Sequence, residues 1–373
     1  MRTPARAPAR TTASRSALLV LLLLATQLVA VAWPAYACGC GGMVTGPGQR
    51  LTVEQETSAV RWDGETEQIV MSLTVAGDAA EAAWIMPVPS RAEVSLGDPE
   101  LFDELWSAAA PEYRDRFYFW PRSGDWPRGE EGDGAMAGAA PGTGAPPVGV
   151  VSRDRLGPFD VARLTATDPT ALEDWLRENG FTLPADMAAE LTPYVEQEWE
   201  YVALRLAPDA AGEQDAVLGG TLDPISLTFA SDELVYPMRL SRLAETEQLL
   251  TLYVLSGHRM EPASTLGGDQ PEVTFAGRLT PAPGPLRDLA GEDAFLTVIR
   301  QEFARPGLIE GDHVLRRTAE DTEFRRVYYD DRLLHWFGVP AWQLTTGAVV
   351  ILALVPAVWA VRQWRRRKDV AWS

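Results

Sequence analysis

The last apolar run of the chain places the strongest constraint on its fold, because it contains no charged residue. The run extends from Ala341 to Val361 and is followed by a basic tail, residues 362–373. At ~1.5 Å rise per residue, a helix of this length reaches ~31 Å, which matches the hydrocarbon core of a bilayer. Trp342 and Trp359 lie near its two ends, as interfacial aromatic residues do. The run therefore predicts one transmembrane helix over residues 341–361.

The N-terminus has the features of a secretory signal. Four arginines precede the apolar segment Ala17–Val31, and Ala35-Tyr36-Ala37 fits the small-residue cleavage rule. We expect a signal peptide over residues 1–37 and a mature chain that begins at Cys38, with a retained signal anchor as the alternative. The basic tail favours a cytoplasmic C-terminus. The predicted location is the cell membrane, single-pass, with the N-terminal domain outside the cytoplasm.

The chain is acidic, with 33 basic and 52 acidic residues and a formal net charge of −19. Because both ends are basic, the part between them is more acidic still. Such a surface disfavours nucleic acid and leaves a cation or an envelope protein as a partner, although solubility alone also explains it. Cys38 and Cys40 are the only cysteines, so apolar burial must hold the outer part together without a disulfide framework. Lys368 is the only lysine and Asn179 the only asparagine, which is typical of a GC-rich bacterial genome.

Alternating apolar residues predict a first β-rich lobe over residues 38–123. Its expected elements are two strands around a turn at Gly64, a third strand, and a helix capped by Asp98. The strands are Thr57–Asp63, Gln68–Val75 and Ala82–Pro87. Residues 124–149 are rich in Gly, Pro and Ala and contain an acidic patch, which predicts a linker or loop.

A second, α+β lobe is predicted over residues 150–283, where a strand, two helices and a strand follow one another between residues 159 and 206. Further strands are expected at Ile225–Ala230, Leu234–Leu240, Leu249–Leu255 and Val273–Leu279. Residues 284–340 are interpreted as a stalk packed on the outer domain, with Phe295–Phe303 as a strand or a short helix. The predicted fold class is α+β with mostly antiparallel sheet, a helical pair and one C-terminal transmembrane helix.

One internal similarity connects the two lobes. Ser72–Asp78 and Ser226–Asp232 agree at five of seven positions, and each precedes a second strand-like segment that contains Pro. Two related β-rich lobes would produce this pattern. A chance match would produce it equally well, because strands favour the same residues.

Several of these segments resemble a known family. The Cys-Gly-Cys-Gly-Gly start, Trp84–Ser90, Trp175–Phe181 with Tyr194-Val195, and Tyr236–Ser241 occur together and in the order found in a bacterial exported family, domain of unknown function 2330. The resemblance covers most of the chain from Cys38 to Tyr329. It implies an exported, often membrane-tethered bacterial protein. It implies no activity and transfers no functional residue.

Cys38 and Cys40 are the candidate metal ligands. Two thiols beside a new α-amino group suit a soft cation such as Cu(I) or Zn(II). A strained, reducible disulfide, a lipidated Cys38 and plain structural packing or pairing are the alternatives. Two observations argue against a lipidated Cys38. Ala35 occupies the position where lipoprotein signals usually have Leu, and a C-terminal span would make a lipid anchor redundant. Two ligands do not complete a zinc site, and the sequence requires no cofactor.

The other chemical groups form no recognised catalytic motif. His258, His313 and His335 lack the spacing of zinc-binding histidines, and no G-x-S-x-G elbow or phosphate-binding loop is present. A set of aromatic residues is compatible with a ligand groove, although core packing is the favoured interpretation: Trp84, Phe117, Tyr118, Phe119 and Trp120.

Two hypotheses about function follow. The first is a non-catalytic, membrane-anchored binding or envelope module, favoured by the predicted anchor and by the lack of a catalytic signature. The second is an envelope metal-binding or thiol-redox protein that uses Cys38 and Cys40.

Overall fold

The computed structural model describes residues 41–125, 159–165, 169–206 and 217–370. The chain divides into two units. Unit 1 comprises Met1–Ala110 and Ser152–Arg325, and unit 2 comprises Pro111–Val151 and Arg326–Ser373. The predicted fold class is confirmed, because the structure is mostly antiparallel sheet with a few helices and one long apolar C-terminal helix.

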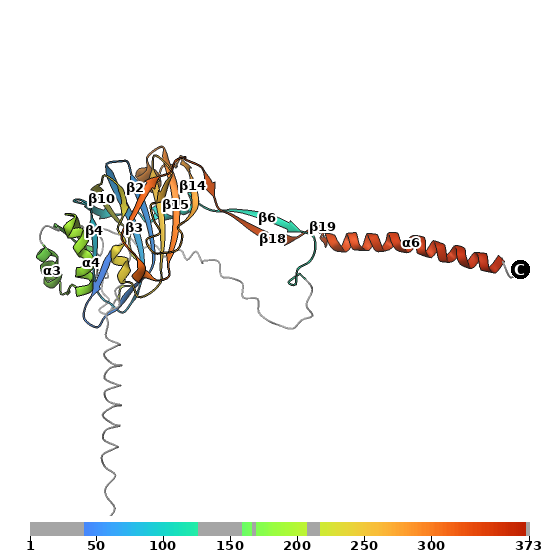
Figure 1. The fold of residues 1–373 in the computed structure, drawn as a ribbon, viewed down its shortest axis with the longest axis horizontal. Helices are drawn as coiled ribbons and strands as arrows, with labels where there is room; N and C mark the ends of the chain where they lie inside the picture. The colour runs from blue at the N-terminus through green and yellow to red at the C-terminus, as the bar shows by residue number, and fades with distance from the viewer. Residues whose placement is uncertain (1–40, 126–158, 166–168, 207–216, 371–373) are drawn as a thin grey trace, which may run out of the picture. The chain divides into compact units, whose positions relative to one another are not determined.

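A large sheet forms the centre of unit 1 (Figure 1). Its strands lie in the order β17, β14, β15, β12, β2, β3, β10, β5, and β9 adds to β3. All neighbours are antiparallel except β2 and β12. The strands are β2 (Leu51–Trp62), β3 (Thr66–Gly77), β5 (Glu93–Leu96), β9 (Gly220–Thr221), β10 (Ile225–Ala230), β12 (Gln248–Ser256), β14 (Glu272–Leu279), β15 (Ala294–Phe303) and β17 (Phe324–Arg325).

A smaller antiparallel sheet carries the helical pair. Its order is β1, β4, β8, β7, with β1 at Gly42–Thr45, β4 at Ala82–Val88, β7 at Phe159–Thr165 and β8 at Glu200–Leu206. The helices α3 (Pro169–Glu178) and α4 (Ala185–Glu196) connect β7 to β8, as the sequence predicts. Leu176 and Met187 from these helices pack with Ile85 of β4 in one apolar cluster.

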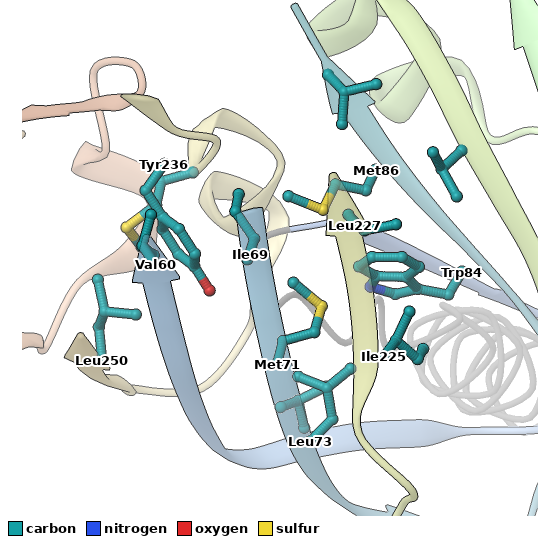
Figure 2. Close-up of a cluster of buried hydrophobic side chains, with 14 of the residues drawn as sticks. Val60, Ile69, Met71, Leu73, Trp84, Met86, Ile225, Leu227, Tyr236 and Leu250 are labelled. Carbon is teal, nitrogen blue, oxygen red and sulfur yellow. The ribbon is translucent and has the colours of Figure 1, made fainter. Parts of the chain in front are cut away.

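The strand β4 lies between two apolar clusters, so all its side chains are buried. Ala83 and Ile85 contribute to the cluster under the helical pair. Trp84, which is 1% exposed, and Met86 point the other way, into the cluster shared with β3 and β10 (Figure 2). Successive side chains of a strand alternate between its faces, and a strand covered on both faces is apolar throughout. This explains the unbroken apolar run of β4.

The large sheet is also covered on both faces. Val60 of β2 belongs to the cluster around Trp84, whereas its neighbour Ala59 faces a third cluster. In that third cluster Leu105 of α2 (Glu100–Ala108) packs with Leu289 of α5 (Pro285–Ala290). The predicted capping role of Asp98 is present in part, because its Oδ1 accepts a hydrogen bond from the N–H of Glu100 at 2.9 Å.

The expected strand Leu234–Leu240 is shorter than predicted. β11 ends at Tyr236, and a 3-10 turn occupies Arg239–Leu243. Pro237 has no N–H for the ladder, which ends the strand there. β11 belongs to a three-stranded sheet in the order β11, β16, β13, with β13 at Met260–Pro262 and β16 at His313–Arg317. A second 3-10 turn spans Pro306–Leu308.

The two similar segments found in the sequence lie on neighbouring strands. β3 and β10 pair antiparallel with Ser226 opposite Val70. The predicted division into lobes and stalk stays a prediction. Residues of the segment 284–340 contribute β15 and β17 to the large sheet of unit 1 and strands to unit 2.

Unit 2 contains a two-stranded parallel ribbon, a short hairpin and the long helix (Figure 1). The ribbon pairs β6 (Glu112–Tyr118) with β18 (Val327–Leu333). The hairpin pairs β19 (His335–Trp336) with β20 (Val339–Pro340), and α6 (Ala341–Val370) follows directly. Within the described part of the chain, α6 is a helix that is long and apolar enough to cross a membrane. The candidate span is Ala341–Arg365, and an 18-residue window within it has a mean hydropathy of 2.2.

Candidate functional site

The predicted ligands Cys38 and Cys40 lie outside the described residues, so the metal and thiol predictions stay predictions. Within the described ranges, no group of three or more His, Cys, Asp and Glu side chains is arranged to hold a metal ion.

His258 is the histidine that most resembles a catalytic one. Its Nδ1 lies 2.9 Å from Oδ2 of Asp321, and Ser256 is two residues away. The hydrogen bond from His258 lowers the pKa of the Asp321 carboxyl, and a bond from the N–H of Arg259 adds to this effect. However, Ser256 Oγ donates to the carbonyl oxygen of His258 at 2.6 Å and thus closes a local turn. A nucleophile is activated by a hydrogen bond to the ring nitrogen of its base, whereas the hydroxyl of this serine is hydrogen-bonded to the backbone of His258.

A buried polar network surrounds Tyr236–Ser241, one of the segments that carry the family resemblance. The Tyr236 hydroxyl donates to the carboxylate of Glu56 and lies 2.6 Å from Ser58 Oγ. Asp312 Oδ1 accepts hydrogen bonds from the N–H groups of Met238 and Arg239, at 2.8 and 3.0 Å.

The hydroxyl of Tyr194 on α4 completes this network by donating to the same Asp312 oxygen at 2.6 Å. Burial and the nearby Asp312 charge raise the pKa of Tyr194. These hydrogen bonds join α4 to the segment after β11 and to the residue before β16. We assign the network to the architecture of unit 1.

A second buried arrangement involves His313 of β16. Gln301 Nε2 donates to the carbonyl oxygens of Thr265 and Asp269, at 2.7 and 2.9 Å. The Oε1 of Gln301 therefore accepts from His313 Nε2, at 2.6 Å, which sets the tautomer of the ring. His313 Nδ1 is buried and has no hydrogen-bond partner among the described residues. Burial lowers the pKa of His313 to about 4.

The ribbon of unit 2 presents a surface that is suited to binding. One of its faces carries paired residues of the two strands, and we call it the tyrosine face: Tyr113, Asp115, Phe117, Tyr328, Asp330 and Arg332. Tyr113 and Tyr328 are directly opposite each other and stack with ring centroids 5.6 Å apart. They are 73% and 43% exposed. A shallow hollow of ≈ 510 Å³ lies here, lined by most of this face together with Tyr329.

Ion pairs balance the charges of the ribbon. On the tyrosine face Arg332 lies 3.1 Å from Asp115 and 2.7 Å from Asp330. On the opposite face Asp331 accepts hydrogen bonds from Arg116 and Arg122, both at 2.6 Å, and these bonds lower the pKa of its carboxyl. The ribbon thus lacks the strong negative charge of the chain as a whole.

The aromatic residues singled out by sequence separate into two groups. Trp84 is a core residue, as the favoured interpretation predicts, whereas Phe117 and Trp120 are exposed in unit 2. Sequence reasoning missed the pairing of Tyr113 with Tyr328. The available signal is weak: aromatic and charged residues are mixed in both Glu112–Tyr118 and Val327–Leu333, which gives neither strand an apolar face.

Comparisons with known proteins give one clear match. The model of a family described as an uncharacterized protein conserved in bacteria matches residues 34–316. No curated protein matches. Two solved structures of baculovirus P35, one of them a mutant after caspase cleavage, share 9% sequence identity with the chain at a TM-score of 0.30. They cover 74% and 72% of this chain and 97% and 98% of their own. A TM-score this low supports no inference about fold or function.

Proposed function

The chain belongs to the bacterial family DUF2330, whose members are uncharacterized, and we therefore propose a function from its own surface. We propose a non-catalytic, membrane-anchored module that binds an extended segment of an envelope protein along the ribbon. The observation that carries this proposal is the exposed stacked pair of Tyr113 and Tyr328 on the two-stranded ribbon of β6 and β18.

Three properties of the ribbon favour a protein partner. Tyrosine is enriched at interfaces because its ring gives contact area at a low entropic cost and its hydroxyl forms hydrogen bonds. Within the described residues β6 and β18 pair only with each other, so their outer edges offer the backbone groups to which a partner strand can add. The arginines and carboxylates are already paired, so the ribbon does not repel an acidic or a basic partner.

The sequence around the ribbon supports anchoring. β18 is separated from α6 only by the short hairpin, so a ligand on the ribbon would be held close to the membrane. The signal-like N-terminus and the basic tail support an extracytoplasmic position for the ribbon and a cytoplasmic C-terminus.

Site-specific photocrosslinking tests the proposal. A photoreactive phenylalanine analogue replaces Tyr113 in the full chain, expressed in its native envelope, and the control carries it at the exposed Glu65 in the β2–β3 turn of unit 1. We expect a discrete protein adduct from position 113 only, and its loss when Tyr328→Ser removes the stacking partner. Equal adducts from both positions, adducts that survive Tyr328→Ser, or glycan adducts alone would contradict a protein partner on the tyrosine face.

The second candidate function is the metal or thiol role of Cys38 and Cys40. It is favoured by the tight attachment of the residue that follows them. A Cβ on Gly41 would lie 2.4 Å from the carbonyl oxygen of Ile85, so the backbone here is pressed against β4. Such an attachment would hold a cysteine site at a fixed place on the fold. Metal analysis and thiol titration of the mature protein test it, and absence of metal together with no effect of Cys40→Ser would refute it.

A further inference from the structure

The hairpin before α6 has an unusual turn. His335 pairs with Pro340 and Trp336 with Val339, which leaves Phe337 and Gly338 as the two turn residues. Both have positive φ angles, 53° and 80°, as in a type I′ turn. Asn-Gly is the favoured pair for this turn, because Asn and Gly tolerate the left-handed conformation. A phenylalanine is strained there, and strained residues of this kind concentrate at functional places.

The side chains at this turn are exposed. Phe337 is 102% exposed and Trp336 is 44% exposed. We call these two residues the hairpin tip. Burial of two large aromatic side chains is strongly favourable, and their exposure at one turn indicates that the tip contacts something else.

The hairpin is fastened to the start of α6. The N–H of Ala341 donates to the carbonyl oxygen of Leu334 at 2.8 Å, and α6 packs against both β19 and β20. Ala341 itself is buried. The hairpin tip is therefore held beside the first turn of the candidate span.

The charge pattern fits a lipid environment. No Asp, Glu, Lys or Arg occurs from Leu333 to Val361, so the uncharged stretch includes the whole hairpin as well as the apolar run. Insertion of the tip among lipid headgroups would therefore desolvate no formally charged side chain of the hairpin. Tryptophan is enriched at this layer because its ring combines an apolar body with a polar N–H. The phenyl ring of Phe337 adds apolar area next to it.

We propose that the hairpin tip inserts into the interfacial layer of the lipid bilayer beside α6 and is a second membrane contact of the chain. The occupant is lipid, because the tip continues directly into the helix that would cross the membrane. This inference rests on the membrane-anchoring part of the proposed function and is independent of the partner at the ribbon.

Depth-dependent quenching tests the position of the tip. The full chain carries Cys38→Ser and Cys40→Ser, and a single cysteine labelled with an environment-sensitive fluorophore replaces Val339 beside the tip, Val350 in the span or Glu65 in unit 1. In vesicles of zwitterionic and anionic phospholipid, we expect the label at 339 to be quenched at least twofold more by shallow than by deep nitroxide lipids. The label at 350 should show the reverse order, and the label at 65 no quenching.

The outcomes separate the two proposals. Quenching at 350 without quenching at 339 would overturn the hairpin inference and leave the span intact. Absence of quenching at 350 would refute the span itself and the hairpin inference with it.

A matched variant tests whether the aromatic side chain matters. Phe337→Asn suits the turn better, so the hairpin should persist, yet shallow quenching at 339 should fall at least twofold. The same change at an exposed phenylalanine of the ribbon, Phe117→Asn, should leave it unaltered. Unchanged quenching in Phe337→Asn would overturn the proposal.

Discussion

The buried His313 should make unit 1 lose stability in mildly acidic solution. In the folded chain the ring is neutral, with a pKa of about 4 in place of 6.5. Protonation would place a charged N–H at Nδ1, which is buried and has no partner among the described residues. Because the folded pKa lies below the unfolded value, the contribution to stability is complete above pH ~6.5 and is lost as the pH falls toward 4.

The size of this effect follows from the two pKa values. Each unit of pKa difference corresponds to ~1.4 kcal/mol, and between pH 7 and pH 5 the linkage relation gives a loss of ~2 kcal/mol in the free energy of unfolding. Glu67 acts in the opposite sense. Its burial raises its pKa well above 4.5, so the stability that it contributes is complete below pH ~4.5 and is lost as the pH rises through its folded pKa.

A comparison of variants separates the contribution of His313 to the pH dependence of stability from the contributions of Glu67 and all other groups. His313→Gln keeps an amide donor toward Gln301 and cannot titrate in this range. Urea unfolding of the full chain in a non-ionic detergent, followed by tryptophan fluorescence, gives the free energy of unfolding at pH 7, 6 and 5. We expect the wild type to lose ~2 kcal/mol more than His313→Gln over this interval.

The result that would refute this reasoning is an equal loss in wild type and His313→Gln. It would mean that the folded ring titrates with its ordinary pKa, as it would if water reached Nδ1. Direct titration of the His313 ring by NMR checks this, since a ring that stays neutral shows little chemical-shift change down to pH 5, whereas a ring with its ordinary pKa changes over this interval.

Three further changes test the packing of unit 1 by the same unfolding measurement. Trp84→Ala should cost about 3–5 kcal/mol, because a fully buried ring between two sheets leaves a cavity; a cost under ~1 kcal/mol would contradict the assigned core. Gly267→Ala should destabilise more than Gly180→Ala. Both glycines have φ near +80°, but only at Gly267 would a Cβ lie 2.1 Å from a backbone carbonyl, that of Leu308; equal losses would show that no such clash exists. Tyr236→Phe should cost about 1–3 kcal/mol, since it leaves buried partners of the hydroxyl unsatisfied, and a neutral result would exclude a stabilising network.

The sequence predicts the local elements well where one face of a strand is apolar. The alternation around Gly64 predicts the β2–β3 hairpin, and the periodicity between residues 159 and 206 predicts the strand-helix-helix-strand unit. Pro237 is visible in the sequence, but the apolar run around it still suggests a longer strand than β11. In each case a short-range pattern determines the element, and its exact end depends on tertiary contacts.

The ribbon and the hairpin tip could not be predicted in the same way. β6 and β18 pair across more than two hundred residues of sequence, and both of their faces are polar or aromatic, so neither local pattern nor periodicity indicates a partner. The turn at Phe337 lacks the Asn or Asp that usually signals a type I′ hairpin. Only the backbone conformation of residue 337 reveals it.

The parallel pairing of β6 with β18 also limits the distance between the stacked tyrosines and the start of α6. Leu334 closes the chain of hydrogen bonds from the ribbon to the long helix, because its N–H donates to Tyr118 and its carbonyl accepts from Ala341. The six residue-to-residue steps from Tyr328 to Leu334 extend ~20 Å at ~3.3 Å per step, and an unpaired segment of the same length would coil to a shorter average span. Pairing with β6 therefore keeps β18 extended. A ligand held on the stacked tyrosines would lie at most ~20 Å along the ribbon from the start of α6. The ribbon would therefore bind only those parts of an envelope molecule that lie within this distance of the bilayer.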